Sequence, residues 1–124
     1  MAEDPIPADV REFIVKNIDS IAYLEALLLL RAHQATVWNA SSVAARLYIE
    51  DVEAAAILSR LVRDDFAKSQ DERYSYECLN EVDTMVDRVA TVYARHLIPV
   101  TNLIHSRPGS IRAFASAFKL RKDP

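Results

Sequence analysis

The side chains that could catalyse a reaction or bind a metal are few in this chain of 124 residues. No two of its histidines, His33, His96 and His105, stand three or four residues apart, the spacing that puts two zinc-binding imidazoles on one helix face. The single cysteine, Cys78, has no histidine near it in the sequence and no second cysteine for a disulfide, so we expect a buried structural thiol. One glycine is too few for a glycine-rich phosphate-binding loop. These residues predict no enzyme, no metal site and no cofactor.

Charge and hydropathy narrow the class of protein further. Apolar residues make up 51% of the chain, charged residues 27%, and the net charge is −3, which predicts one globular domain over residues 1–124. This negative net charge excludes a protein that binds nucleic acid through a generally basic surface. The longest apolar run, residues 21–30, is too short to cross a bilayer, and the first five residues lack a signal-peptide pattern. We expect a cytoplasmic protein with no membrane partner. Asp83 and Asp87 share one face of a predicted helix and, beside Arg88, are interpreted as solvated surface charges.

The scarcity of glycine favours a mainly α fold, because folds rich in sheet need more glycine in their tight turns. Apolar residues at helical spacing predict the helices, and two runs of strand-like pattern predict short strands. The expected helices lie within residues 8–20, 21–33, 41–47, 51–64, 80–105 and 110–121, with a brief strand at 36–39 and a hairpin of 66–69 with 73–78. Pro99 is expected to kink the helix at 80–105.

Between Ile21 and Cys78 the expected order is helix, short strand, helix, tight turn, helix and two-stranded hairpin. The segments that carry this pattern are Leu24–Leu30, Thr36–Trp38, Ser42–Ile49 and Ala54–Leu61. They resemble the winged helix-turn-helix superfamily of bacterial transcriptional regulators. The resemblance implies a winged helix-turn-helix core with a small hairpin wing, extended by an N-terminal helix and long C-terminal helices. A glycine usually ends the second helix of the helix-turn-helix there, whereas this chain has Asp64 or Asp65 in that place.

The resemblance further implies that the helix at 51–64 enters the major groove of duplex DNA. The candidate DNA-binding residues are Arg46, Arg60, Arg63, Lys68 and Arg73. However, residues 50–66 have a net charge of −3 and residues 67–77 a net charge of −1, while phosphate contacts require lysine or arginine. The leading interpretation is a small DNA-binding transcriptional regulator. The alternative is a winged-helix module that has lost DNA binding and joins other proteins.

The helix at 80–105 carries apolar residues at a spacing close to a heptad repeat, the pattern of a seam between paired helices. The predicted dimer interface consists of Val82, Val86, Val89, Tyr93, Leu97 and Val100. We expect a homodimer that pairs through this face. The alternative is that the same face packs on Val10, Phe13 and Ile14 of the first helix.

The last expected helix, within 110–121, has an apolar stripe of Ile111, Phe114 and Phe118. Residues 107–124 also carry a net charge of +4. We expect this stripe to dock on its own chain or on the dimer partner. The alternative, which is less common for such a stripe, is that it anchors another protein. A membrane surface is the least favoured alternative, because the apolar area is small.

Overall fold

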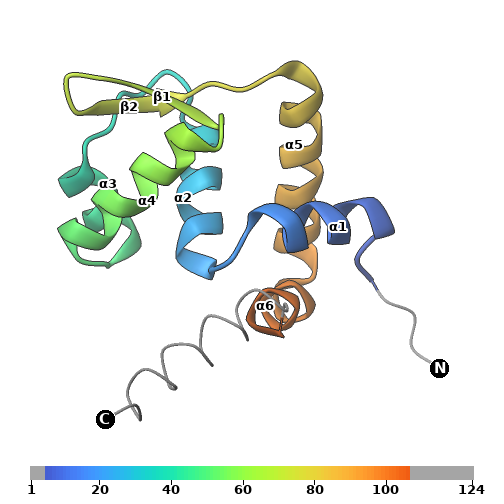
Figure 1. Ribbon diagram of the computed structural model, residues 1–124. Coiled ribbons are helices and arrows are strands. Elements are labelled where there is room, and N and C mark those ends of the chain that lie inside the picture. Colours follow the sequence, from blue (N-terminus) through green and yellow to red (C-terminus); the bar gives the residue numbers. More distant parts are fainter. Residues whose placement is uncertain (1–4, 107–124) are drawn as a thin grey trace, which may run out of the picture. The chain divides into compact units, whose positions relative to one another are not determined.

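The computed structural model describes residues 5–106, which fall into two compact units (Figure 1). One unit comprises residues 22–86, and the other combines residues 5–21 with residues 87–106. The expected fold class is confirmed: the protein is mainly helical, with a winged helix-turn-helix core and a small two-stranded antiparallel sheet. The stripe at Ile111, Phe114 and Phe118 lies outside the described residues, so its docking stays a prediction.

Three helices build the unit of residues 22–86, namely α2 (Ile21–Ala32), α3 (Ala40–Leu47) and α4 (Asp51–Arg63). The expected cap is present, because the Asn39 side chain accepts a hydrogen bond from the Ser42 amide while the Ser42 hydroxyl accepts one from the Asn39 amide. The α2 helix is apolar nearly all round and buries five of its twelve residues, as expected of a central helix. On α4 the buried residues are Ala54, Ile57, Leu58 and Leu61, which repeat at helical spacing.

The wing consists of β1 (Ala67–Gln70) and β2 (Arg73–Tyr76), paired antiparallel with Gln70 opposite Arg73. The expected strand at 36–39 is a single residue, Trp38, whose amide and carbonyl both bond to Tyr74 at 2.7 Å. Figure 1 shows the loop between α2 and α3 running beside the hairpin. The hairpin turn has two residues rather than the expected three, because Gln70 belongs to β1.

The second unit contains α1 (Ala8–Asn17), the later part of α5 (Asn80–Arg95) and α6 (Leu97–Ser106), and α1 packs against α6 (Figure 1). The expected single helix at 80–105 is wrong, since it divides at His96. Pro99 explains the division, because its ring would clash with the carbonyl of Arg95 four residues earlier and it has no amide hydrogen. Helical bonding resumes with the amide of Val100, which donates to the carbonyl of His96.

Both residues of the wing turn have positive φ, 53° at Asp71 and 61° at Glu72. A two-residue hairpin turn of this kind strongly prefers glycine in the second place, because a side chain there costs about 1–2 kcal/mol. We expect Glu72→Gly to raise the melting temperature of the winged-helix core by about 4 °C, equivalent to about 1 kcal/mol. Thermal unfolding followed by the emission of Trp38, the single tryptophan, measures this.

Glu72→Ala is the matched control, since it removes the same charge but keeps a side chain at positive φ. Its melting temperature should stay at the wild-type value. An equal rise in both variants would contradict the conformational explanation and assign the effect to charge.

Candidate nucleic-acid interface

One stripe of exposed residues on α4 is nearly free of charge, although the exposed carboxylates of Asp51 and Glu53 stand beside its start. Val52, Ala56, Ser59 and Arg63 all lie at the surface, four, three and four residues apart, opposite the buried side of the helix. Only the last of the four is charged. Small neutral side chains on such a face can approach base edges closely, and a valine or alanine can contact a thymine methyl group.

Arg60 does not join this exposed face, because it is half-buried and its guanidinium faces α2. Its guanidinium lies over the ring of Tyr23 on α2, 4.5 Å from the ring centre. The Tyr23 hydroxyl donates a 2.6 Å hydrogen bond to the Asp64 carboxylate at the end of α4. A cation over an aromatic face is stabilised by the ring quadrupole. Arg60 therefore fastens α4 to α2, and its prediction as a DNA contact is not supported by its placement.

The other candidate cations differ in how they are held. Arg46 lies over the Trp38 ring at 5.6 Å, and Arg63 pairs with Asp64 at 3.6 Å. Lys68 pairs with Glu77 at 3.3 Å, with both side chains largely exposed. Within residues 5–106, Arg73 makes no ion pair. Exposed pairs contribute at most about 1 kcal/mol, so Arg63 and Lys68 can exchange their carboxylates for a phosphate.

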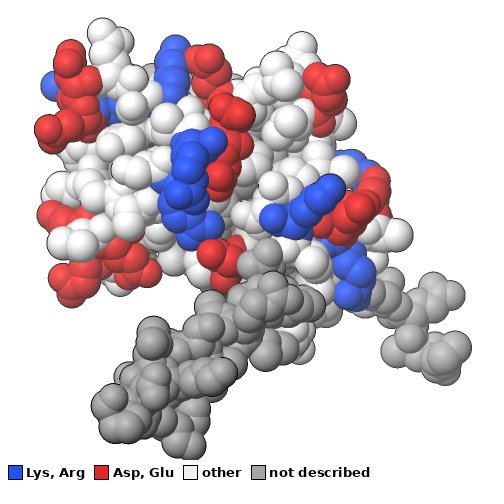
Figure 2. Space-filling view, viewed as in Figure 1, with Lys and Arg blue, Asp and Glu red and all other residues white. Residues whose placement is uncertain are grey.

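Carboxylates outnumber cations on the exposed surface of residues 40–77. The seven exposed acids are Glu50, Asp51, Glu53, Asp65, Asp71, Glu72 and Glu77, and the four exposed bases are Arg46, Arg63, Lys68 and Arg73. Figure 2 shows acids at the tip of the hairpin and around the start of α4, with an uncharged area between them. The acidic balance predicted from the sequence thus lies on the surface that would face DNA.

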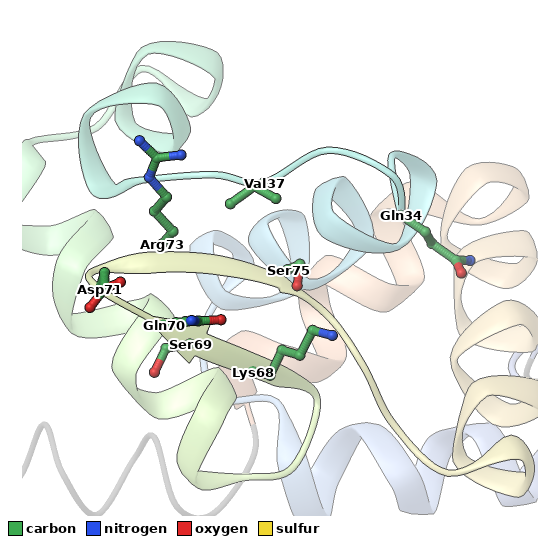
Figure 3. Close-up of a pocket in the computed structure, with 8 residues that line it drawn as sticks. All are labelled: Gln34, Val37, Lys68, Ser69, Gln70, Asp71, Arg73 and Ser75. Carbon is green, nitrogen blue, oxygen red and sulfur yellow. The ribbon is translucent and has the colours of Figure 1, made fainter.

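The outer face of the wing forms a hollow of about 730 Å³ (Figure 3). By the strand register, Lys68, Gln70, Arg73 and Ser75 share this face, and Val37 borders it from the α2–α3 loop. In Figure 3 the guanidinium of Arg73 points away from the hairpin. The hollow combines the two cations Lys68 and Arg73 with amide and hydroxyl groups, which suit phosphate oxygens, and with the carboxylate of Asp71, which opposes them.

The sequence analysis missed an exposed apolar pair at the helix-turn-helix turn. Tyr48 is 95% exposed and has φ of 59°, and Val52 in the first turn of α4 is 82% exposed. An aromatic residue in the left-handed region is uncommon, and full exposure gives it no packing role. The tight turn was predicted, but the pattern gave no signal for the direction of the tyrosine.

Half of the predicted dimer interface is buried within the chain itself. Val86, Val89 and Val100 are fully buried, while Val82 and Tyr93 are half-buried, and pairing with a second copy stays a prediction. Leu97 is 51% exposed, and Ile98, which the heptad pattern omitted, is 64% exposed.

Two features are absent from the described part of the chain, a cluster of metal-binding side chains and a membrane-spanning helix. Among residues 5–106 no three side chains of the metal-binding types gather into a possible site. No helix in the same range has the length and apolar character needed to cross a bilayer.

Arg60 and Arg63, one turn apart on the same helix, should differ in their effect on stability. We expect Arg60→Ala to lower the free energy of unfolding by about 1 kcal/mol, because the contact with Tyr23 and its buried stem are lost. Arg63→Ala should change it by less than about 0.5 kcal/mol. Urea denaturation of the two variants measures the difference, and equal stability of both would contradict the role given to Arg60.

The comparisons with known proteins give one structural likeness. The crystal structure of RV1404 from Mycobacterium tuberculosis matches with 16% sequence identity and a TM-score of 0.49, over 94% of this chain and 84% of that chain. No protein-family model matches the chain. No curated protein matches it. A likeness at this level supports no conclusion about function.

Proposed function

We propose that residues 22–86 bind duplex DNA and that the protein is a small transcriptional regulator. The observation that carries the proposal is the exposed neutral face of α4 within a helix-turn-helix, with the wing and its Arg73 in the same unit. In this arrangement α4 lies in the major groove, where Val52, Ala56 and Ser59 meet base edges. Arg63, Lys68 and Arg73 meet phosphates.

The balance of exposed acids and bases determines how strongly DNA binding would depend on salt and on sequence. Each neutralised phosphate contributes about 0.9 to the slope of log affinity against log salt concentration. The four exposed cations of residues 40–77 contribute at most about 4 to that slope, and the seven exposed acids of the same residues oppose association. We therefore propose weak non-specific affinity, with sequence preference supplied by contacts of α4 rather than by charge.

A homodimer and a cytoplasmic location accompany this proposal. A dimer doubles a small set of contacts and gives two half-sites. Leu97 and Ile98 are the exposed apolar residues that favour pairing in the second unit, in place of the buried valines. Duplex DNA would be the partner.

A second candidate function is docking of another protein on the turn between α3 and α4. Tyr48 and Val52 are exposed apolar side chains, and Glu50, Asp51 and Glu53 are exposed acids around them. A surface that joins apolar area to negative charge favours a basic protein segment over a polyanion. The two functions compete for the same residues, so one measurement on α4 separates them.

The proposed function is tested by fluorescence anisotropy with a pool of random duplexes across a salt series. We expect binding with enrichment of a preferred sequence, and a contribution to the slope of at most about 4 from the exposed cations of residues 40–77. Arg63→Ala combined with Arg73→Ala should reduce the slope by about 2. Lys16→Ala combined with Arg95→Ala removes the same charge outside residues 40–77 and should leave the slope unchanged. Absence of binding at low salt would overturn the proposal.

The placement of α4 in the groove predicts that its acids weaken binding. Asp51→Asn combined with Glu53→Gln should strengthen DNA binding by about tenfold, because two carboxylates no longer face phosphates. Glu12→Gln combined with Glu81→Gln is the control with equal charge change elsewhere. If both pairs have the same small effect on anisotropy, α4 does not enter the groove and protein docking becomes the favoured function.

A further inference from the structure

We infer that Asp83 is the positioning residue of the wing, holding β2 through Tyr76 and holding itself in place through Arg31. This inference names the residue that sets the geometry of Arg73, and it rests on the proposed function only for its consequence in DNA binding. All the residues involved belong to the unit of residues 22–86.

The wing cannot hold its own place. Each strand has four residues, and an isolated two-stranded hairpin is at best marginally stable in water. Its turn is further disfavoured by the positive φ of Asp71 and Glu72. Contacts from outside the hairpin must therefore fix the wing. The Trp38–Tyr74 bridge holds the β2 edge of the hairpin. Where the two strands meet the rest of the chain, the Glu77 amide donates a hydrogen bond to the Phe66 carbonyl, which holds the start of β1 beside the end of β2.

The end of β2 has a different attachment. The Tyr76 hydroxyl donates a 2.6 Å hydrogen bond to Oδ1 of Asp83 on the first turn of α5. Nε of Arg31, at the end of α2, donates to the same oxygen at 2.9 Å. The thiol of Cys78 donates to the Tyr76 oxygen at 3.1 Å. One carboxylate oxygen thus joins α2, β2 and α5, so Asp83 is a bonded side chain, although 37% exposed, rather than a simple surface charge. Cys78 is half-buried rather than buried as expected.

The protonation states suit this attachment. The hydrogen bonds from Tyr76 and from Arg31 hold the pKa of Asp83 below its usual value. Burial raises the pKa of Tyr76, and its hydrogen bond to Asp83 raises it further. At neutral pH the carboxylate is therefore charged and the phenol keeps its proton, which is the pair of states that makes a strong charge-assisted hydrogen bond.

Tyr76, through which Asp83 holds β2, lies close to Arg73 along the same strand. Tyr76 and Arg73 are the two ends of β2, about 10 Å apart at roughly 3.3 Å per residue. With Tyr76 held at one end and Tyr74 held in the middle by Trp38, the direction of β2 is fixed, and with it the base of the Arg73 side chain. Without Asp83 the end of β2 would lose its side-chain attachment, and the Trp38–Tyr74 pairing and the hydrogen bond from Glu77 to Phe66 would open more often.

The first test does not depend on DNA. In Asp83→Asn the amide keeps the shape but loses the charge, and we expect hydrogen exchange at the Trp38 and Tyr74 amides to accelerate by about tenfold. Exchange at buried amides of α4, such as Leu58 and Leu61, should stay within about twofold. Asp83→Glu should restore part of the protection. Uniform acceleration across α4 would mean that Asp83 only stabilises the fold, and unchanged exchange at Trp38 and Tyr74 would equally overturn the inference.

A matched control comes from the other unit. Asp9 accepts a hydrogen bond from Arg88 there, so Asp9→Asn removes one charged acceptor of the same chemistry without touching the wing. Exchange at Trp38 and Tyr74 should be unchanged in this variant. Acceleration equal to that in Asp83→Asn would assign the effect to net charge and reject the positioning role.

The same variants then separate the inference from the proposed function. If the protein binds DNA, Asp83→Asn should weaken binding to the level of Arg73→Ala, and adding Arg73→Ala should weaken it no further. If the wild type binds no DNA while exchange at Trp38 accelerates in Asp83→Asn, the positioning role stands and the proposed function fails. If the protein binds DNA and the two variants weaken it additively, Asp83 does not act through Arg73 and the inference fails.

Discussion

The backbone pairing of Trp38 with Tyr74 is the constraint on which the winged-helix core depends. It joins residues 36 positions apart in the sequence and closes a loop of chain that contains α3, α4 and β1. Loop closure of this length costs entropy, which packing around the indole ring must offset. Arg46 lies over that ring, and His33 meets it edge to face with ring centres 6.0 Å apart. The indole N–H is buried without a hydrogen-bond partner among residues 5–106, so apolar burial of Trp38 must outweigh that penalty too.

Turns without glycine are the second constraint on this part of the molecule. Within residues 5–106, positive φ occurs at four residues that carry a side chain, Tyr48, Asp65, Asp71 and Glu72. They lie at the turn into α4, directly after α4 and at the wing tip, so every junction that orients the candidate interface is conformationally disfavoured. Tertiary contacts must compensate. The hydrogen bonds from Tyr23 to Asp64 and from the Phe66 amide to the Leu61 carbonyl do so at the end of α4.

Local patterns in the sequence predicted the elements but not the contacts between them. Asn39 could be identified as a cap, and the buried side of α4 as an apolar stripe, because both depend on residues within one or two turns. The sequence also predicted that Asp64 or Asp65 takes the place of the glycine that usually ends this helix, and Asp65 does have positive φ. The roles of Arg60 and Asp83 could not be predicted, since they depend on Tyr23, 37 positions before Arg60, and on Arg31, 52 positions before Asp83. A basic residue that packs on an aromatic ring has the same local sequence signal as one that faces solvent.

The acidic surface and the exposed apolar residues can be understood together if the protein is a DNA-binding dimer. Few exposed cations give the surface of residues 40–77 little affinity for phosphates, and its exposed acids lower it further, so this surface of one copy alone would bind weakly at physiological salt. Two copies linked through an apolar surface bind as one, and the second contact is then favoured by effective concentration rather than by charge. Low non-specific affinity also raises the ratio of specific to non-specific binding, which is the quantity that matters in a genome. In such a dimer, weak DNA binding by one chain would make pairing necessary, and exposed Leu97 and Ile98 would supply the apolar surface for that pairing.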